Sequence, residues 1–209
     1  MYRYKTIFKE AEAEQTIDRS RFIASVRPVE SRDEAESFIA SIRSKNKGAN
    51  HNVPAIVLGD KFQIQWASDD GEPQGTAGAP IVQMLVKEEI TNIAVVVTRF
   101  FGGIKLGTGG LVRAYTSSAK LGLTSAGICR VIDMTVLKLR LDYSFLSKVQ
   151  NVSQNEPFDI REIEYTDAVT MNIALEPENS DHVKSLLADI SAGSCVVLSE
   201  SEELLRVKE

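Results

Sequence analysis

A cluster of glycines between an apolar segment and a helical pattern limits most strongly how this chain can fold. Ile93–Val97 is continuously apolar and rich in valine, which is typical of a strand buried on both faces. Glycine in regular structure costs about 0.5–1 kcal/mol relative to alanine. The loop after the strand therefore needs unusual backbone angles or a close neighbour at its five glycines, Gly102, Gly103, Gly107, Gly109 and Gly110.

The segment after this loop has the spacing of a helix that packs on the sheet. Its apolar side chains recur every four residues from Leu111 to Leu123. We expect Thr108 to cap this helix, whose N-terminus would attract an anion. The predicted anion or nucleic-acid site comprises Arg99, Gly102, Gly103, Lys105, Gly107, Thr108, Gly109, Gly110 and Arg113. The alternative is a tight turn whose glycines only permit close helix–sheet packing. The loop is neither a G-x-G-x-x-G nor a Walker A motif.

The rest of the first 130 residues alternates between strand and helix patterns. Ser31 and Glu34 form a predicted capping box before a helix that buries Ala35, Phe38, Ile39 and Ile42. A second helix is expected from Pro80, with Ile81, Val82, Leu85 and Val86 buried. Further strands are predicted at Tyr4–Lys9 and Arg21–Val29. Two more, Val53–Leu58 and Phe62–Trp66, are expected to form a hairpin that turns at Gly59-Asp60.

The pattern restarts after Gly127 and predicts a second domain. Its expected elements are strands at Thr135–Leu141, Ile160–Tyr165, Val169–Leu175 and Ser194–Leu198, and helices at Phe145–Val152 and from Asn179 or Ser180 to Ile190. This βαββαβ order is that of a ferredoxin-like domain. Residues 1–130 hold 17 basic and 14 acidic side chains, whereas residues 131–209 hold 7 and 15. We therefore predict an α+β protein with domains at 1–130 and 131–209, of which the first suits an anionic partner better.

An acidic stretch before the second helix offers weak candidates for a metal site. Asp69, Asp70 and Glu72 could hold a hard cation or supply an acid and a base. Their spacing is not that of an EF-hand, and Asp-Gly is also a common turn pair. His51 more often serves a structural than a catalytic role in such a context. With no nucleophile motif, we expect neither a catalytic residue nor a cofactor.

Composition favours a cytoplasmic protein. The first residues are charged and have no apolar core like that of a signal peptide. No apolar run approaches the length of a membrane span, so we expect no membrane partner. The two cysteines, Cys129 and Cys195, match no metal or redox spacing. Oligomeric state is left open.

Several motifs closely resemble the Impact family, in particular its bacterial YigZ-like branch, over essentially the whole chain. They lie at His51–Ala55, Ser68–Pro73, Gly75–Gly78, Val97–Gly103 and Leu106–Tyr115. The resemblance implies an N-terminal fold like the second domain of ribosomal protein S5 and a ferredoxin-like domain like the last domain of elongation factor G. His51, Asp69, Asp70 and Glu72 match family motifs as a shared surface. Phe100 stands where the family commonly has tyrosine.

The resemblance implies a translation-associated function without catalysis. Eukaryotic members regulate translation through an additional N-terminal domain that has no counterpart in this sequence. We expect binding to RNA or the ribosome through the basic glycine loop. Alternatives are a protein-interaction module, with a translation-regulatory protein bound by the acidic second domain, and an enzyme acting on a phosphorylated small molecule, by fold analogy alone.

Overall fold

The computed structural model describes residues 2–208, which form two compact units. Of the described residues, one unit contains 3–131 and 206–208, and the other contains Tyr2 and 132–205. The strand β7 (Ile128–Leu141) begins in the first unit and continues into the second. β1 (Tyr2–Ile7) pairs with β7.

The first unit is built on an antiparallel sheet in the order β2-β3-β6-β4-β5. Its strands are β2 (Ala11–Ile17), β3 (Ser20–Pro28), β4 (His51–Leu58), β5 (Ile64–Ala67) and β6 (Ile93–Phe100). β6 is central, so Val97 lies opposite Ala24 of β3 and Val53 of β4. All its residues except the last are buried, as the continuous apolar run predicts.

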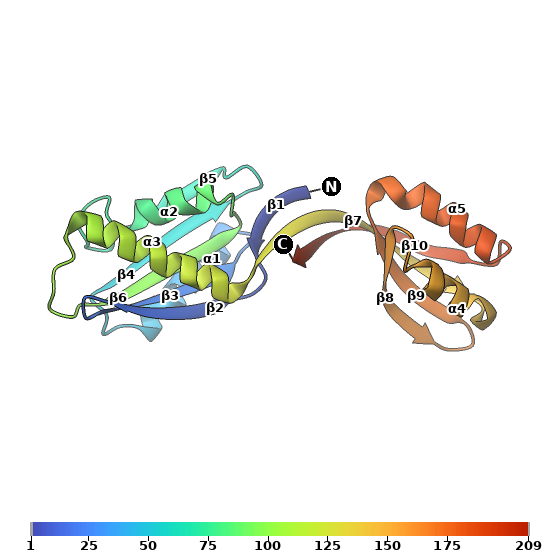
Figure 1. The fold of residues 1–209 in the computed structure, drawn as a ribbon, viewed down its shortest axis with the longest axis horizontal. Coiled ribbons are helices and arrows are strands. Elements are labelled where there is room, and N and C mark those ends of the chain that lie inside the picture. Colours follow the sequence, from blue (N-terminus) through green and yellow to red (C-terminus); the bar gives the residue numbers. More distant parts are fainter. Residues whose placement is uncertain (1, 209) are drawn as a thin grey trace. The chain divides into compact units, whose positions relative to one another are not determined.

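Helices cover both faces of this sheet (Figure 1). α2 (Gly78–Lys87) and α3 (Gly107–Ala126) pack on one face, where Leu111, Tyr115, Ala119 and Leu123 are buried as expected. α1 (Arg32–Lys45) covers the other face with its four predicted apolar side chains. Because alternate side chains of a strand point to opposite faces, β6 contributes Val95 and Val97 to one core and Ala94 and Val96 to the other.

Two local predictions need correction. The α1 capping box is shifted, because Ser31 Oγ accepts from the Glu34 N–H at 3.2 Å but the Glu34 carboxylate reaches the N–H of Glu30. Val86 of α2 is only partly buried.

Sequence reasoning missed strand β2. Its first five residues, Ala11–Gln15, are alanine, glutamate and glutamine, which are depleted in or neutral for strands, and β-branched residues come only at its end, Thr16 and Ile17. A tight turn joins it to β3 at Asp18 and Arg19, which have φ angles of 44° and 63°. This turn packs against the glycine loop at Gly102.

The second unit has the predicted ferredoxin-like arrangement. The sheet order is β10-β7-β9-β8, with β8 (Phe158–Tyr165), β9 (Val169–Leu175) and β10 (Val196–Lys208). α4 (Tyr143–Val152) and α5 (Ser180–Ile190) bury Val149, Val183 and Leu187 against it. A short 3-10 helix, Pro177–Asn179, precedes α5, which has no side-chain cap at Asn179. The α+β class and the two-domain fold are thus confirmed.

The second unit should fold without the first, because it has its own apolar core. A fragment of residues 132–205 should show a single cooperative urea transition. Circular dichroism and intrinsic tyrosine fluorescence, followed in parallel, should give coincident curves. A gradual, non-cooperative loss of signal would contradict independent folding.

Candidate functional site

The loop between β6 and α3 is held against the β2–β3 turn by a close backbone approach. A Cβ atom at Gly102 would lie 2.0 Å from the carbonyl oxygen of Arg19, so only glycine fits there. The Gly102 N–H donates to Ser20 Oγ, and the Phe101 N–H donates to Asn50 Oδ1 at 2.8 Å. Close packing thus explains Gly102, although its neighbour is a strand turn and not the helix–sheet interface.

Other glycines of the loop serve backbone geometry. Gly103 and Gly107 have φ angles of 87° and 70°, and nothing lies within 4 Å of the position of a Cβ at either residue. The prediction that Thr108 caps α3 is wrong, because the helix begins at Gly107 and Thr108 lies in its first turn. Leu106 occupies the capping position and offers no side-chain hydrogen bond. Side-chain capping therefore does not compete for the N–H groups at the start of α3.

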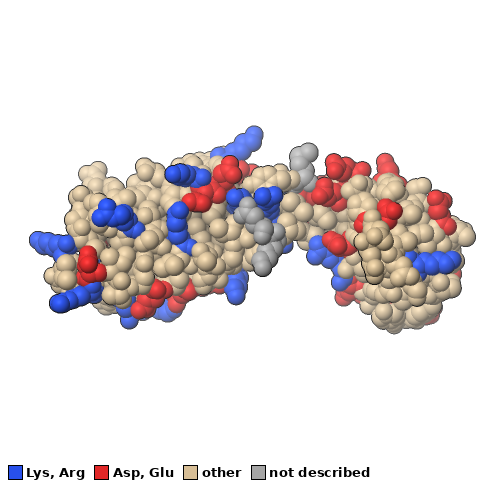
Figure 2. Space-filling view, in the orientation of Figure 1, with Lys and Arg blue, Asp and Glu red and all other residues tan. Residues whose placement is uncertain are grey.

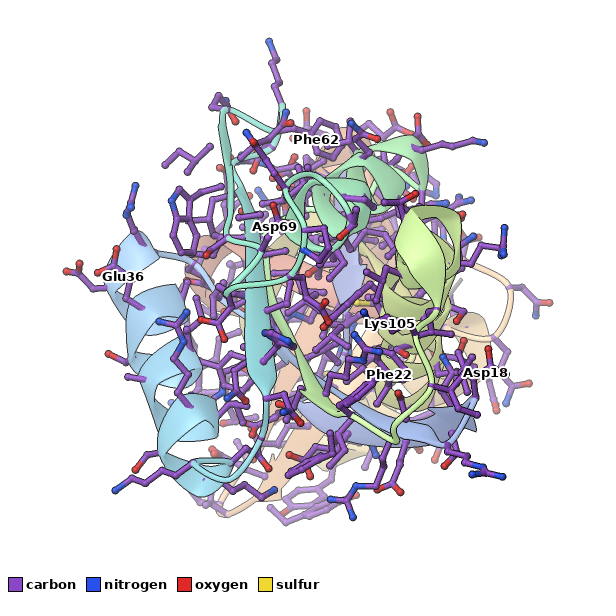
Figure 3. The ribbon with its side chains drawn as sticks, turned by 90° about the vertical axis from the view of Figure 1, so that its left-hand side faces the viewer. Asp18, Phe22, Glu36, Phe62, Asp69 and Lys105 are labelled. Atoms are coloured by element: carbon purple, nitrogen blue, oxygen red, sulfur yellow. The ribbon has the colours of Figure 1, made fainter. Side chains whose placement is uncertain are left out.

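Two of the three predicted cations are exposed at this helix start. In Figure 3, Lys105 lies on the loop that leads into α3, and Asp69 lies in the loop before α2. The Arg113 guanidinium covers Gly109, since its Nη1 would be 3.8 Å from a Cβ at that glycine. Gly110 packs under Leu106, whose Cβ would lie 3.0 Å from a Cβ there. Lys105 and Arg113 thus add positive charge to the start of the helix.

Arg99 differs from the expectation that it is a third free cation. Only 5% of it is exposed, and its Nη1 lies 2.6 Å from Oε1 of the buried Glu72. Nη2 donates to Ser20 Oγ, whereas Nε is buried with no partner among the described residues. The guanidinium also lies 5.4 Å from the ring centroids of both Phe22 and Phe101. Its charge is neutralised within the protein, because Arg99 lies at the end of β6 on the core side of the loop.

Tyr115 of α3 completes this buried cluster. Its hydroxyl donates to Glu72 Oε1 at 2.7 Å, and its ring packs edge-on against Phe22. Burial, followed by the hydrogen bond to Glu72, raises the pKa of Tyr115 far above its usual value, so the hydroxyl stays protonated. Sequence analysis assigned Tyr115 only to the apolar stripe. A signal was available, since a buried tyrosine hydroxyl usually has a hydrogen-bond partner.

His51 and Asp70 form a neighbouring network around the start of β4. His51 Nδ1 lies 2.8 Å from the Asp70 carbonyl, which can only accept, so Nδ1 carries the proton. His51 Nε2 is 3.8 Å from Glu72 Oε1. The Asp70 carboxylate accepts from the Asn52 N–H at 2.6 Å and from Arg43 at 3.1 Å. These contacts tie β4 and α1 to the loop after β5.

Asp69 caps the loop that leads into α2. Its carboxylate accepts from the N–H groups of Gly75, Ala77 and Gly78 at 2.8, 3.1 and 2.9 Å. Burial alone would raise the pKa of Asp69, but these hydrogen bonds outweigh it and lower the pKa. The three carboxylates therefore serve different partners. Within residues 2–208, no group of three or more His, Cys, Asp or Glu could hold a metal ion.

A pocket of about 400 Å³ opens between the acidic stretch and the glycine loop. We call it the Glu72 pocket, and its lining residues are Glu72, Pro73, Arg99, Phe101, Lys105, Leu106, Gly107, Thr108 and Leu111. Only Glu72 of the three acidic candidates reaches it. The pocket thus combines an apolar wall, a buried carboxylate and the positive start of a helix, and it can accommodate a small polar ligand with a flat apolar face.

Asp69→Asn should lower the free energy of unfolding by about 1 kcal/mol at neutral pH, because the amide has only one acceptor oxygen and its N–H₂ group would face a backbone N–H that the carboxylate now accepts from. Since the pKa of Asp69 is lowered in the folded state, its contribution is complete above the ordinary aspartate value and disappears as the pH falls through the folded value. The deficit of the variant should therefore shrink below about pH 4. Urea unfolding across pH measures this difference. The control is Asp167→Asn, whose side chain is 87% exposed; an equal effect there would contradict the capping role.

Arg99→Met should destabilise the protein by roughly 3–5 kcal/mol, because it leaves the buried Glu72 carboxylate without its cation. Glu72→Gln should also be destabilising. The double variant should lose less stability than the sum of the two single losses, since it removes both charges. A double-mutant cycle of urea unfolding measures this coupling, and strictly additive losses would contradict a direct ion pair.

Comparison with known proteins places the chain in a family. Residues 18–123 match the Impact N-terminal domain, and residues 139–194 match a domain of unknown function, DUF1949. The chain is 36% identical over 193 residues to the IMPACT family member YvyE of Bacillus subtilis, covering 92% of this chain and 89% of that protein. It is 33% identical over 190 residues to the IMPACT family member YigZ of Escherichia coli, covering 90% and 93%.

The fold of the whole chain is also found in a solved structure. A crystal structure described as that of a hypothetical protein is similar with a TM-score of 0.60 and 31% identity, covering 100% of this chain and 99% of the other. Among residues 2–208, none of the helices has the length and apolar character needed to cross a membrane. On the strength of its two domains and its full-length relatives, the chain belongs to the Impact family.

Proposed function

We propose that this Impact-family protein is a non-catalytic, translation-associated protein that binds single-stranded RNA at the start of α3. The observation that carries the proposal is the uncapped N-terminus of a 20-residue helix with two exposed cations beside it. Backbone N–H groups at a helix start favour a phosphate, and the cations at Lys105 and Arg113 add to the attraction.

An exposed aromatic ring supports RNA over a simple anion. Phe101 is 46% exposed and directly follows β6 in the same loop. Proteins that bind single strands combine cations along the backbone with aromatic side chains on which bases stack. The guanidinium of Arg99 lies over the Phe101 ring, 5.4 Å from its centroid. Phosphate and base contacts are thus available within one loop.

The charge on this part of the surface supports the same partner. Lys and Arg side chains gather at the end of the first unit that carries the loop, on the left in Figure 2. Arg19, in the β2–β3 turn packed against Gly102, is exposed there too. The net charge of the whole chain is −5, so binding depends on this local patch and should be sensitive to salt.

Lys105→Ala combined with Arg113→Ala should reduce the salt dependence of RNA binding. Each phosphate contact to a single strand contributes about 0.7 to the slope of log K against log salt, so the slope should fall by about 1.4. Fluorescence anisotropy of a labelled single-stranded RNA of about twelve nucleotides, between roughly 50 and 200 mM salt, measures this slope. Co-sedimentation with ribosomal subunits over the same salt range tests the association with translation.

Lys120→Ala is the matched control for this experiment. Lys120 lies on the same helix, far from its start, and forms an exposed ion pair with Glu88 at 2.7 Å. Its removal should leave the slope unchanged and cost little stability. A slope unaffected by the double variant, or reduced equally by the control, would rule out the helix start as the RNA site.

A further inference from the structure

One oxygen of the Glu72 carboxylate has no hydrogen-bond donor among the described residues, and phosphate binding at the start of α3 does not explain this. The Glu72 side chain is only 4% exposed, and the hydrogen bonds it receives from the described residues all reach Oε1. Oε2 accepts none of the hydrogen bonds formed among residues 2–208. Among residues 2–208 the buried side-chain polar atom left without a partner is Nε of Arg99 and not this oxygen, so Oε2 is accessible and can accept from a donor supplied by a ligand.

The geometry fixes this carboxylate in place before any ligand arrives. Arg99 and Tyr115 hold Oε1 from β6 and α3 at 2.6 and 2.7 Å. The carboxylate therefore has little freedom to rotate, and Glu72 lines the pocket beside the helix start. A preorganised group of this kind binds with a smaller entropic penalty than a mobile surface side chain.

We propose that the Glu72 pocket takes one unstacked nucleobase of the bound RNA and that this base is guanine. The inference rests on the proposed RNA function. Guanine alone among the four RNA bases presents two neighbouring donors, N1–H and N2–H₂, on one edge, and the free Oε2 can accept from them. Uracil presents one donor between two carbonyl oxygens, which the carboxylate repels.

The remaining walls of the pocket fit the rest of a nucleotide. Pro73, Leu106 and Leu111 offer an apolar surface, and Phe101 offers an exposed ring for stacking. Lys105 and the first N–H groups of α3 border the same space and suit the phosphate attached to the base. The volume of about 400 Å³ falls within the range of small-molecule sites. A carboxylate for the base edge and cations for the phosphate thus lie at one site.

The test compares three short RNA probes that differ in one base. A labelled uridine oligomer carries guanosine, inosine or uridine at its centre, and anisotropy gives the affinity of the full-length protein for each. Inosine differs from guanosine only by the missing 2-amino group. The guanosine oligomer should bind roughly 5- to 100-fold more tightly than the uridine oligomer, with inosine between them.

Two variants locate this preference in the pocket. Glu72→Gln should abolish the preference for guanosine, because the amide offers uracil both a donor and an acceptor. Circular dichroism checks that this variant folds, since it also removes the charge that partners Arg99. Thr108→Trp tests the pocket independently, as the indole should fill it from the first turn of α3 and equalise the three affinities. Its control is Thr124→Trp near the end of the same helix, where the preference should persist.

The outcomes separate this inference from the proposed function. Salt-dependent binding of all three probes with equal affinity would overturn the guanine pocket and leave RNA binding intact. Salt-dependent binding with a preference for guanosine that survives Thr108→Trp would also overturn it. No binding to any probe would overturn both proposals. A preference that is lost in Thr108→Trp and retained in Thr124→Trp would support the pocket.

Discussion

The buried ion pair between Arg99 and Glu72 is the interaction on which the arrangement of this end of the first unit depends. Arg99 lies at the end of β6, and Glu72 lies in the loop before α2. Tyr115 of α3 donates a hydrogen bond to Glu72, and Ser20 of β3 accepts one from Arg99. Four separate segments therefore meet at two side chains. Because an unpaired charge in this position would be strongly destabilising, the pair selects one geometry for the loop even where its net contribution to stability is small.

This pair also divides the basic residues of the glycine segment into two groups. Arg99 has its charge neutralised in the core, whereas Lys105 and Arg113 remain at the surface beside the helix start. A flexible glycine loop alone would place such cations poorly. Here its beginning is fixed by the contact of Gly102 with the β2–β3 turn and by the Asn50 hydrogen bond to Phe101. The exposed cations thus extend from an anchored loop, which preserves their spacing for a ligand.

Sequence patterns predicted the fold well where burial is periodic. The apolar run in β6 and the four-residue stripe of α3 reflect the faces they bury, and the βαββαβ order of the second unit follows from alternating strand and helix spacing. The sequence pattern did not predict β2, because backbone hydrogen bonds pair it with β3 and this pairing needs little apolar surface. The start of α3 was misplaced by two residues, because Thr108 has the side chain of a cap but the capping position is that of Leu106.

The site was less predictable because its chemistry depends on which side chains meet in three dimensions. Asp69, Asp70 and Glu72 look alike in sequence, yet backbone N–H groups satisfy the first, a histidine and arginine network surrounds the second, and only the third is buried against Arg99. A side-chain charge that the sequence suggests is available for binding can instead be neutralised by an oppositely charged side chain inside the protein. Conversely, an oxygen that the core leaves without a donor becomes available to a ligand, although nothing in its local sequence distinguishes it. At this end of the protein, the tertiary partners of each charged side chain therefore decide whether it stabilises the fold or faces a ligand.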